Sequence, residues 1–315
     1  MPLELRVVPL EFVLQAKDAV HFPAGKATNI IRGALGYALR RTAGPDLYSH
    51  IFEGETGGAR PSGYQEAPRP FVLRWNDWGD MTYQRGQQFA VRLHVFDSST
   101  DVLAELIQAF AILGPEGLGQ ERARVELVRI RQPLGEAGRS IDLWRSGAAD
   151  VDEPRCISVP LGSCDAPRRI KVTYDSPTEI KEGGRVLKQI PFAPLFLRAH
   201  ERVLFFVRHY AMENPEQIEA AIREESDAII DDARQIRTVH ETLGRVELSR
   251  YSTNTGQTHP LSGFYGESEF EGDFTRLWNW LKAAEWTGVG RQTVWGKGAI
   301  RVSGGERVVS AKAGH

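Results

Sequence analysis

Cysteine is scarce in this sequence, and long apolar runs are missing. Only Cys156 and Cys164 occur in 315 residues, which argues against a disulfide framework and favours a reducing, cytoplasmic location. No stretch approaches the roughly 18 apolar residues of a membrane-spanning helix. The alternating segment 1–12 also lacks the basic-then-apolar form of a signal peptide. The sequence therefore predicts a cytoplasmic protein with no membrane partner, long enough for two domains.

The motifs of several common chemistries are missing as well. Gly25 and Lys26 are not preceded by the glycine of a P-loop, and no Ser or Thr follows the lysine directly. The glycines of 288–298 do not spell G-x-G-x-x-G, and they precede a strand, whereas a dinucleotide turn opens a helix. There is no second cysteine pair for zinc, no G-x-S-x-G and no H-E-x-x-H. We therefore expect neither a cofactor nor a metal.

Charge is nearly balanced over the whole chain but unevenly distributed along it. The net charge is −2 with 25% charged residues, which does not suit a uniformly basic nucleic-acid-binding protein. Segments 26–41 and 291–301 are cationic, while 213–232 is strongly acidic. A locally basic groove on a neutral protein is the arrangement that this pattern predicts.

The hydrophobic periodicity gives the same order of elements twice. In each half a strand is followed by a helix, two strands, a second helix and a last strand, which is the ferredoxin-like β-α-β-β-α-β plan. In the first half we expect strands at 3–14, 70–75, 87–96 and 123–130, and helices at 29–41 (N-cap Asn29 or Thr28) and 101–113. In the second half we expect strands at 168–175, 244–252, 262–270 and 299–302, and helices at 194–210, 214–240 and 273–284.

The predicted fold class is therefore α+β, with two tandem ferredoxin-like (βαββαβ, RRM-like) domains. We assign residues 1–140 to the first domain and 155–305 to the second, with the linker inside 131–166. Asn214 and Pro215 favour the start of an additional acidic helix, so the second domain is expected to carry a helical insertion at 213–240.

The segment TGVGRQTVWGKG, residues 287–298, is the first candidate site. Glycines allow backbone N–H groups to approach a polyanion, two basic side chains add charge, and a tryptophan offers a ring on which a base can stack. The alternative is a tight helix-to-strand turn around a core tryptophan. The RNA-binding candidates here are Gly288, Gly290, Arg291, Trp295, Gly296, Lys297 and Gly298.

The basic first helix and the residues after it form the second candidate site. RNA cleavage without a metal needs a base for the 2′-hydroxyl proton, an acid for the leaving 5′-oxygen and cations beside the phosphate. A histidine can serve in either proton role near neutral pH. His50 is the first candidate and His21 the second, while the alternative is that His50 only caps a helix or faces solvent. The other candidates are Tyr37 and Arg40 for catalysis, and Lys26, Arg32 and Arg41 for RNA binding.

Two segments resemble a known family. Residues 31–40, IRGALGYALR, resemble the first-helix signature of the CRISPR-associated repeat-processing endoribonucleases of the RAMP superfamily. Residues 263–266, 288–291 and 296–298 are similar to that family's C-terminal glycine signature. The two motifs occur in the family's order on a doubled ferredoxin-like plan.

The resemblance implies metal-independent cleavage of precursor CRISPR RNA (pre-crRNA) within the repeat. It implies products with a 5′-hydroxyl and a 2′,3′-cyclic phosphate, and transfer of the crRNA to a CRISPR effector complex. His50 and Tyr37 each fall about one residue from the family's histidine and tyrosine. No lysine follows His50 closely, so Arg40 or Arg41 would supply the positive charge.

Two other functions remain open from the sequence. A non-catalytic RAMP subunit that binds a guide RNA would need the fold and the glycine turn but no proton-transfer histidine. A small-molecule-binding α+β protein would need a deep apolar pocket. The sequence also leaves a homodimer open.

Overall fold

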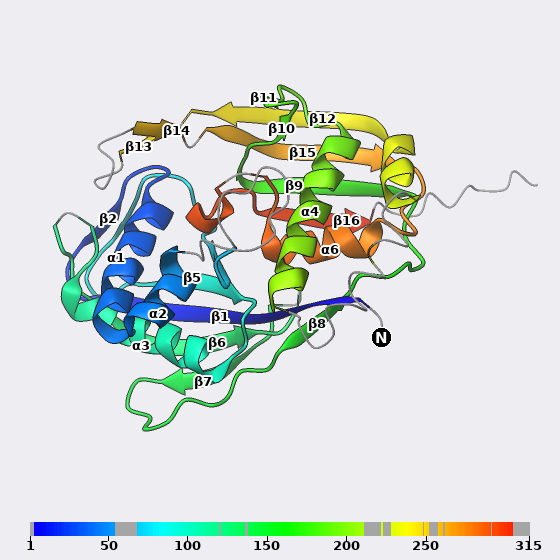
Figure 1. The fold of residues 1–315 in the computed structure, drawn as a ribbon. Helices are drawn as coiled ribbons and strands as arrows, with labels where there is room; N and C mark the ends of the chain where they lie inside the picture. The colour runs from blue at the N-terminus through cyan, green and yellow to red at the C-terminus, as the bar shows by residue number, and fades with distance from the viewer. Residues whose placement is uncertain are drawn as a thin grey trace, which may run out of the picture.

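A computed structural model describes residues 3–53, 68–119, 121–135, 138–210, 222, 228–247, 249–251, 258–260, 262–290 and 292–304. The described residues form two large antiparallel sheets and three two-stranded ones. Each large sheet is covered on one face by helices, and the helices of the second half lie between its sheet and strand β1 (Figure 1). Among the helices of the described ranges, none has the length and apolar character needed to cross a membrane.

The first sheet has the strand order β3-β5-β1-β6-β7, with α1 and α3 packed on one face. Its first four strands follow the ferredoxin-like order. The elements of this half are β1 (Glu4–Ala16), β2 (Val20–Phe22), α1 (Ala27–Thr42), α2 (Pro45–Tyr48), the π-helix η1 (Ser49–Glu53), β3 (Phe71–Arg74), β4 (Met81–Tyr83), β5 (Gln88–Val95), α3 (Thr100–Glu116), β6 (Val125–Pro133) and β7 (Ser140–Arg145).

The second sheet has the order β12-β15-β9-β16 and carries α4 and α6 on its inner face. The predicted fold of two tandem ferredoxin-like units is therefore confirmed. The elements are β8 (Ile157–Pro160), β9 (Arg169–Thr178), β10 (Lys181–Glu182), β11 (Arg185–Val186), α4 (Phe192–Tyr210), β12 (Arg237–Val246), β13 (Ser249–Tyr251), β14 (Thr258–Pro260), β15 (Gly263–Glu271), α6 (Trp278–Thr287), the 3-10 helix η2 (Thr293–Trp295) and β16 (Ile300–Gly304).

The apolar spacing that predicted these elements is the spacing that fills the cores. On α1, Ile31, Leu35 and Leu39 are fully buried at intervals of four residues, the spacing of one helix face. In the same core the ring of Phe110 on α3 stacks on Phe12 of β1 at 3.8 Å between centroids. Burial of such side chains contributes about 1.5–3 kcal/mol each.

Three predictions about the organisation were wrong. The N-cap of α1 is Lys26, which makes no side-chain cap hydrogen bond, in place of Asn29 or Thr28. The predicted linker contains β7 and β8, and β8 pairs with the first residues of β1. The helix expected to reach about 240 ends at residue 235, and residues 237–246 form β12 along β15. Residues 213–221 and 223–227 of the expected insertion lie outside the described residues.

The two halves meet at the carboxyl end of α6. The carbonyl oxygen of Trp286 accepts hydrogen bonds from His94 Nδ1 at 2.9 Å and from Arg74 Nη2 at 3.0 Å. Arg202 of α4 donates through Nε to the next carbonyl, that of Thr287, at 2.9 Å. A helix end leaves such carbonyls without intrahelical partners, so donors from the first sheet and from α4 complete the helix.

Buried histidines make the stability of this fold depend on pH. Burial, with a smaller contribution from nearby Arg74, lowers the pKa of His94 to about 3, and burial lowers the pKa of His200 to about 4. Both folded-state values lie below the unfolded one, so only the unfolded chain takes up these protons below about pH 6.5. Stability is complete above that pH and is lost as the pH falls toward the folded pKa values.

We therefore expect the free energy of unfolding to fall between about pH 6.5 and pH 4, by up to about 1.4 kcal/mol per pH unit for each histidine. Urea unfolding at several pH values measures this. His94→Asn, which keeps an N–H donor toward the Trp286 carbonyl, should remove about half of the slope. His240→Asn, at an exposed position, is the matched control, and an unchanged slope in His94→Asn would contradict the prediction.

Candidate active site

The segment after α1 turns back along the helix and carries His50. Arg40 of α1 donates through Nη2 to the Tyr48 hydroxyl at 3.0 Å. One turn further on, the ring of Phe52 lies where a side chain at Gly36 would stand. A Cβ at position 36 would force the Phe52 ring to shift. Phe52 packs against α1, whereas His50, two residues earlier on the π-helix, contacts Asp97 and Tyr210.

The imidazole of His50 is paired with a carboxylate from the end of β5. His50 Nε2 lies 2.8 Å from Asp97 Oδ2, and Asp97 Oδ1 accepts the backbone N–H of Ser99 at 3.0 Å. Burial raises the pKa of the Asp97 carboxyl, but the hydrogen bonds from Ser99 and His50 outweigh burial and lower it overall. The side chain of His50 is 29% exposed, so the pair lies at the surface with one side covered.

The second half of the chain covers that side. Tyr210, at the end of α4, lies edge-on to His50 with 6.3 Å between ring centroids, and its hydroxyl donates to the Pro68 carbonyl. One turn earlier, Phe206 contacts Phe96 at 4.0 Å. His50 and Asp97 are thus located at the junction of the two halves.

His21, the second candidate, has a different environment. It lies on β2, and its Nε2 is 3.1 Å from Asp80 Oδ1 and 3.2 Å from Oδ2. The two side chains are 48% and 66% exposed. An exposed ion pair of this kind constrains its members weakly.

The other residues proposed for the first site are spread over α1. Tyr37 is half exposed on the surface of the helix. The guanidinium of Arg40 lies 5.1 Å over the ring of Tyr48, two residues before His50. Arg41 forms an ion pair with Glu116, and Lys26 occupies the N-cap of the helix. The structure therefore brings Arg40 to the segment of His50 and leaves Tyr37 on the open surface.

Arg32 was expected to contact RNA, but its side chain is directed inward. It is 4% exposed, and its guanidinium lies 4.0 Å from the Phe52 ring centroid and 4.6 Å from that of Trp295. Its Nη2 also donates to the Phe52 carbonyl at 3.4 Å. This cation held between two aromatic rings joins α1, the π-helix of His50 and the glycine-rich turn.

The glycine-rich turn is packed against protein on several sides. Gly288, Gly290, Gly296 and Gly298 all have positive φ, which favours glycine. At Gly298 a side chain would also collide with the carbonyl of Val289, whose own N–H donates to the Gly298 carbonyl at 2.8 Å. These glycines are therefore needed for the backbone path and close packing of the turn.

Lys297 is likewise directed into the protein. It is fully buried, and its ammonium donates to the Ser262 carbonyl at 2.7 Å and to Gln292 Oε1 at 3.0 Å. Burying an ammonium is costly unless it is hydrogen-bonded, and Gln292 of the turn and Ser262, just before β15, supply the acceptors. The expectation that Lys297 presents its charge at the surface does not match this placement. Arg291 lies outside the described residues.

Asp97 and Tyr210 are site residues that the sequence reasoning missed. Asp97 precedes Ser98 and Ser99 at the start of a helix, which is an ordinary capping pattern. Tyr210 ends an apolar helix that was interpreted only as core. Nothing in the spacing relates either residue to His50, because the contacts join segments that are far apart in the chain. Among the described residues, no group of three or more His, Cys, Asp or Glu side chains is placed to hold a metal ion.

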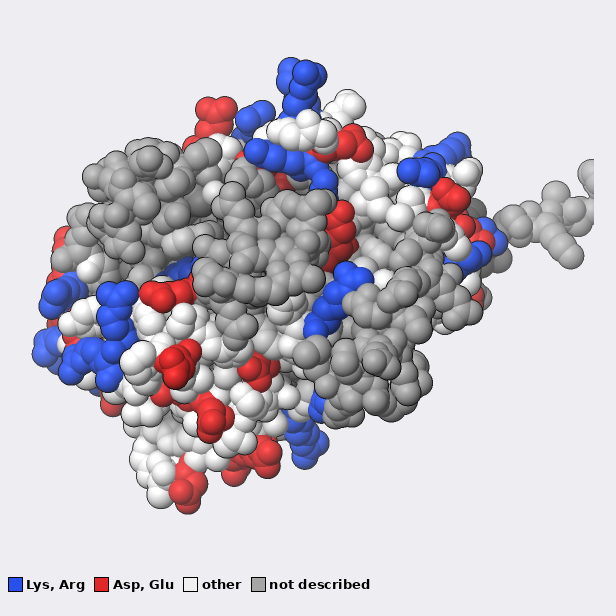
Figure 2. Space-filling model, viewed as in Figure 1, with Lys and Arg blue, Asp and Glu red and all other residues white. Residues whose placement is uncertain are grey.

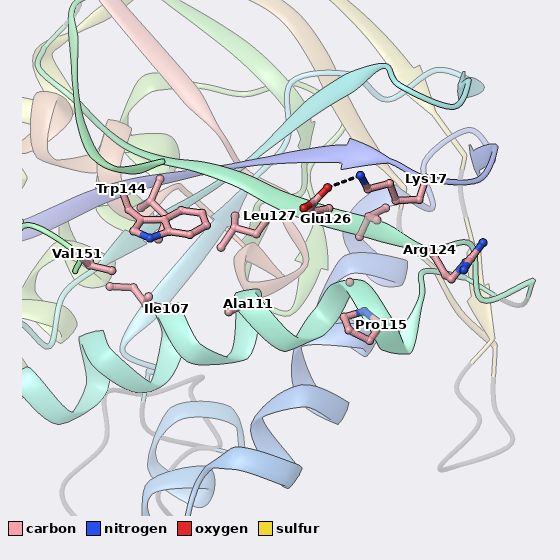
Figure 3. A pocket seen from close by; sticks show the side chains of 12 residues that line it. Lys17, Ile107, Ala111, Pro115, Arg124, Glu126, Leu127, Trp144 and Val151 are labelled. Atoms are coloured by element: carbon pink, nitrogen blue, oxygen red, sulfur yellow. Dashed lines mark ion pairs between the residues drawn. The ribbon is translucent and has the colours of Figure 1, made fainter. Parts of the chain in front are cut away.

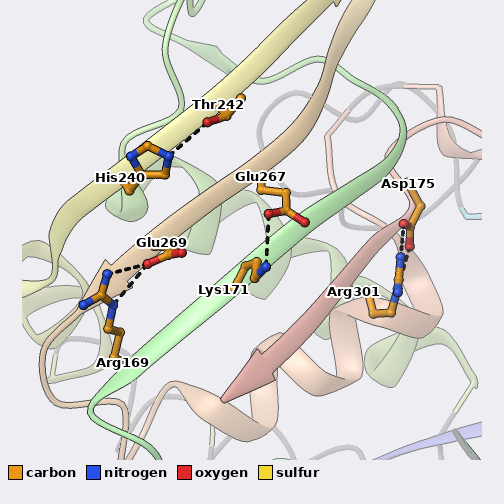
Figure 4. A network of polar contacts seen from close by, with 8 residues as sticks. All are labelled: Arg169, Lys171, Asp175, His240, Thr242, Glu267, Glu269 and Arg301. Atoms are coloured by element: carbon orange, nitrogen blue, oxygen red, sulfur yellow. Dashed lines mark hydrogen bonds and ion pairs between the residues drawn. The ribbon is translucent and has the colours of Figure 1, made fainter. Parts of the chain in front are cut away.

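The two sheets differ in how their charged side chains are paired. On the second sheet each cation of the described ion pairs has its own carboxylate (Figure 4). On the first sheet Arg92 and Arg131 share Glu11, and Arg129 and Arg145 share Asp142. The pairs of the second sheet are Arg169–Glu269, Lys171–Glu267, Arg301–Asp175 and Arg237–Glu271. In the view of Figure 2 the charges of both signs are interspersed over the described surface.

A separate apolar groove lies on the first half, between α3 and the β6-β7 edge (Figure 3). Ile107, Leu127 and Trp144 line it, and the Lys17–Glu126 ion pair closes one end. It is open to solvent along its length, and its lining includes none of the candidate site residues. A groove of this kind suits apolar side chains better than a polyanion.

Comparison with known proteins identifies two matching families. Residues 5–155 match a family model described as an N-terminal domain, and residues 172–300 match the model of the CRISPR-associated endoribonuclease Cas6. No curated protein matches the sequence.

Solved structures share the fold along nearly the whole chain. A product complex of Thermus thermophilus Cas6 gives a TM-score of 0.56 at 16% identity, covering 94% of this chain and 99% of that one. Thermus thermophilus Cas6 itself gives 0.53 at 15%, covering 95% and 99%. A partial Cas6-RT-Cas1–Cas2 complex gives 0.56 at 14%, covering 96% of this chain and 46% of that one.

Lys297→Met tests whether this lysine acts in the fold or on RNA. Loss of its hydrogen bonds should lower the free energy of unfolding by about 1–3 kcal/mol, because buried acceptors lose their donor. The dependence of RNA affinity on salt should stay unchanged. Urea unfolding and binding titrations from low to high salt measure the two effects. A salt slope flattened by about one phosphate contact would show instead that the ammonium reaches RNA.

Proposed function

The chain belongs to the Cas6 family of CRISPR-associated endoribonucleases, and from this premise we propose that it cuts CRISPR repeat transcripts (pre-crRNA) to crRNA by metal-independent acid–base chemistry. The substrate is the repeat, and the products carry a 2′,3′-cyclic phosphate and a 5′-hydroxyl. The observation that supports this chemistry is the His50–Asp97 pair, half-covered at the junction of the two halves.

The proposed reaction is a transesterification within the RNA. The 2′-oxygen loses its proton and attacks the neighbouring phosphorus, while the bond from phosphorus to the 5′-oxygen breaks and that oxygen takes up a proton. His50 serves one of the two proton transfers. Arg40, held beside Tyr48, supplies positive charge toward the phosphate, where charge accumulates in the transition state. Tyr37 is proposed to assist from the exposed face of α1.

His50 is favoured over His21 on geometry. Its carboxylate contact is shorter, and both of its partners are fixed by other contacts, Asp97 by Ser99 and Tyr210 by Pro68. Catalysis depends on groups held in place before the reaction. His21 pairs with an exposed carboxylate on a short ribbon of two strands, so we rank it second.

RNA binding is proposed to use Lys26, Arg41 and Arg291 as phosphate contacts, while the glycine-rich turn holds Trp295 against Arg32. The proposed binding partners are the repeat RNA and, after cleavage, a CRISPR effector complex. Among the similar structures, one is a Cas6 product complex and another is a Cas6-RT-Cas1–Cas2 complex. The shared fold supports the expectation of RNA binding and of association with a CRISPR complex.

The alternative of a non-catalytic guide-binding subunit keeps the same fold. The oriented histidine favours the enzyme, because a subunit that only binds RNA has no need of an imidazole held by a carboxylate. The small-molecule alternative would use the apolar groove of Figure 3, which is open and lies away from the conspicuous basic helix.

Incubation of the purified protein with a labelled repeat RNA in excess chelator tests the proposed function. We expect cleavage at one position within the repeat and a product end that resists ligation until the cyclic phosphate is removed. Intact RNA that remains tightly bound would support the guide-binding subunit. Absence of both binding and cleavage would overturn both functions.

His50→Ala should lower the single-turnover cleavage rate by about 10²–10⁴-fold, the scale for loss of a general acid or base. Affinity for an RNA with a 2′-deoxy group at the cleavage position should be largely kept. His21→Ala is the matched variant and should cut at nearly the rate of the parent protein. If the two variants behave the other way round, the catalytic role moves to His21.

A further inference from the structure

Asp97 gives each of its carboxylate oxygens a separate partner. Oδ1 accepts the Ser99 N–H at 3.0 Å, and Oδ2 lies 2.8 Å from His50 Nε2. An ionised carboxylate can only accept hydrogen bonds, so Nε2 must be the nitrogen that carries the hydrogen. In the neutral imidazole the basic nitrogen is then Nδ1. The position of Asp97 thus selects one of the two tautomers of His50.

Contacts from both halves of the chain hold this arrangement. Phe96, the residue before Asp97, packs on Phe206 of α4, and its N–H donates to the Pro70 carbonyl at 2.7 Å. Tyr210, one turn after Phe206, lies edge-on to the imidazole. Asp97 is held through the contacts of its neighbour Phe96 and through the Ser99 hydrogen bond to its carboxylate. It can therefore orient the His50 imidazole at little further cost in conformational entropy.

We propose that Asp97 is the positioning residue of the active site. It fixes His50 in the tautomer whose Nδ1 exchanges the proton with RNA, and its charge stabilises the imidazolium. If His50 is the base, the proton passes from the 2′-hydroxyl to Nδ1. If His50 is the acid, the proton passes from Nδ1 to the 5′-oxygen. In both cases Asp97 stays ionised and touches neither atom, in the manner of the aspartate of a Ser-His-Asp triad. This inference rests on the proposed function and on the role of His50.

The chain supplies its own control for the effect of such a pair. His21 and Asp80 form a second histidine–carboxylate contact, but it is exposed and its histidine nitrogen lies at nearly equal distances from both oxygens. Asp97→Asn and Asp80→Asn remove the same charge and keep the same size. At position 97 the asparagine can still accept the Ser99 N–H, so the start of α3 is preserved.

The experiment compares the parent protein with Asp97→Asn, Asp80→Asn and His50→Ala. The single-turnover rate on labelled repeat RNA is measured from about pH 5 to pH 9, with binding of the 2′-deoxy RNA and thermal unfolding as further measurements. We expect Asp97→Asn to cut about 10–100-fold more slowly, the scale on which carboxylate partners of functional histidines act. The histidine-dependent limb of its pH profile should move to lower pH, because a nearby carboxylate favours the imidazolium. RNA affinity and melting temperature should be nearly unchanged.

The outcomes separate this inference from the proposed function. If His50→Ala is inactive while Asp97→Asn keeps the parent rate and pH profile, Asp97 has no positioning role and the proposed function stands. A slower Asp97→Asn with an unmoved profile and a lowered melting temperature would assign Asp97 to stability alone. If His50→Ala cuts at the parent rate, both the role of His50 and that of Asp97 are overturned. A slow Asp80→Asn beside a normal Asp97→Asn would assign positioning to the other pair.

Discussion

The carboxyl end of α6 is the constraint on which the rest of this structure depends. Arg74 and His94 from the first sheet and Arg202 from α4 donate to the carbonyls of its last residues. Burial, with a smaller contribution from Arg202, lowers the pKa of Arg74 to about 9, so the cation is held in place at a cost. Arg74 Nη2 donates to the Glu285 and Trp286 carbonyls, although its buried Nη1 has no hydrogen-bond partner among the described residues. The negative end of the α6 dipole also favours a cation at this place. The two ferredoxin-like units are therefore joined by polar contacts in addition to apolar packing.

This junction also fixes the candidate site, because α6 runs directly into the glycine-rich turn. The turn places Trp295 beside Arg32, Arg32 contacts Phe52, and Phe52 lies two residues from His50. From the other side, α4 brings Phe206 and Tyr210 to Phe96 and His50. The position of the imidazole is thus set by the docking of one half on the other. A change at the turn is expected to reach His50 through packed side chains, without any contact to RNA.

The sequence predicts much of the fold and less of the site. Apolar periodicity identified the helices and most strands, because burial of one face dictates the spacing. It missed the start of β12, where an acidic segment was interpreted as continuous helix, although Thr238 and Leu243 pair along β15. It also placed Lys297 at the surface, since a basic residue between glycines resembles a phosphate contact. Whether its ammonium faces solvent or the Ser262 carbonyl depends on the path of the turn. The His50–Asp97 pair joins residues 47 positions apart, and no local pattern encodes such a contact.

The two sheets of this chain, whose net charge is −2, pair their charged side chains differently. On the face of the first sheet that directs Arg74 and His94 toward the end of α6, Arg74, Arg92, Glu11, Arg131 and Asp142 lie opposite one another on successive strands. In this row Arg92 and Arg131 share Glu11, and Arg74 donates to the end of α6, whereas the described ion pairs of the second sheet match one to one (Figure 4). Interactions between exposed charges fade beyond about 8–10 Å in physiological salt. A phosphate therefore responds to the charged side chains near it more than to the net charge of the chain. The charges that the proposed RNA partner would meet are therefore those of local arginine and carboxylate groups, and the net charge of −2 does not by itself argue against RNA binding.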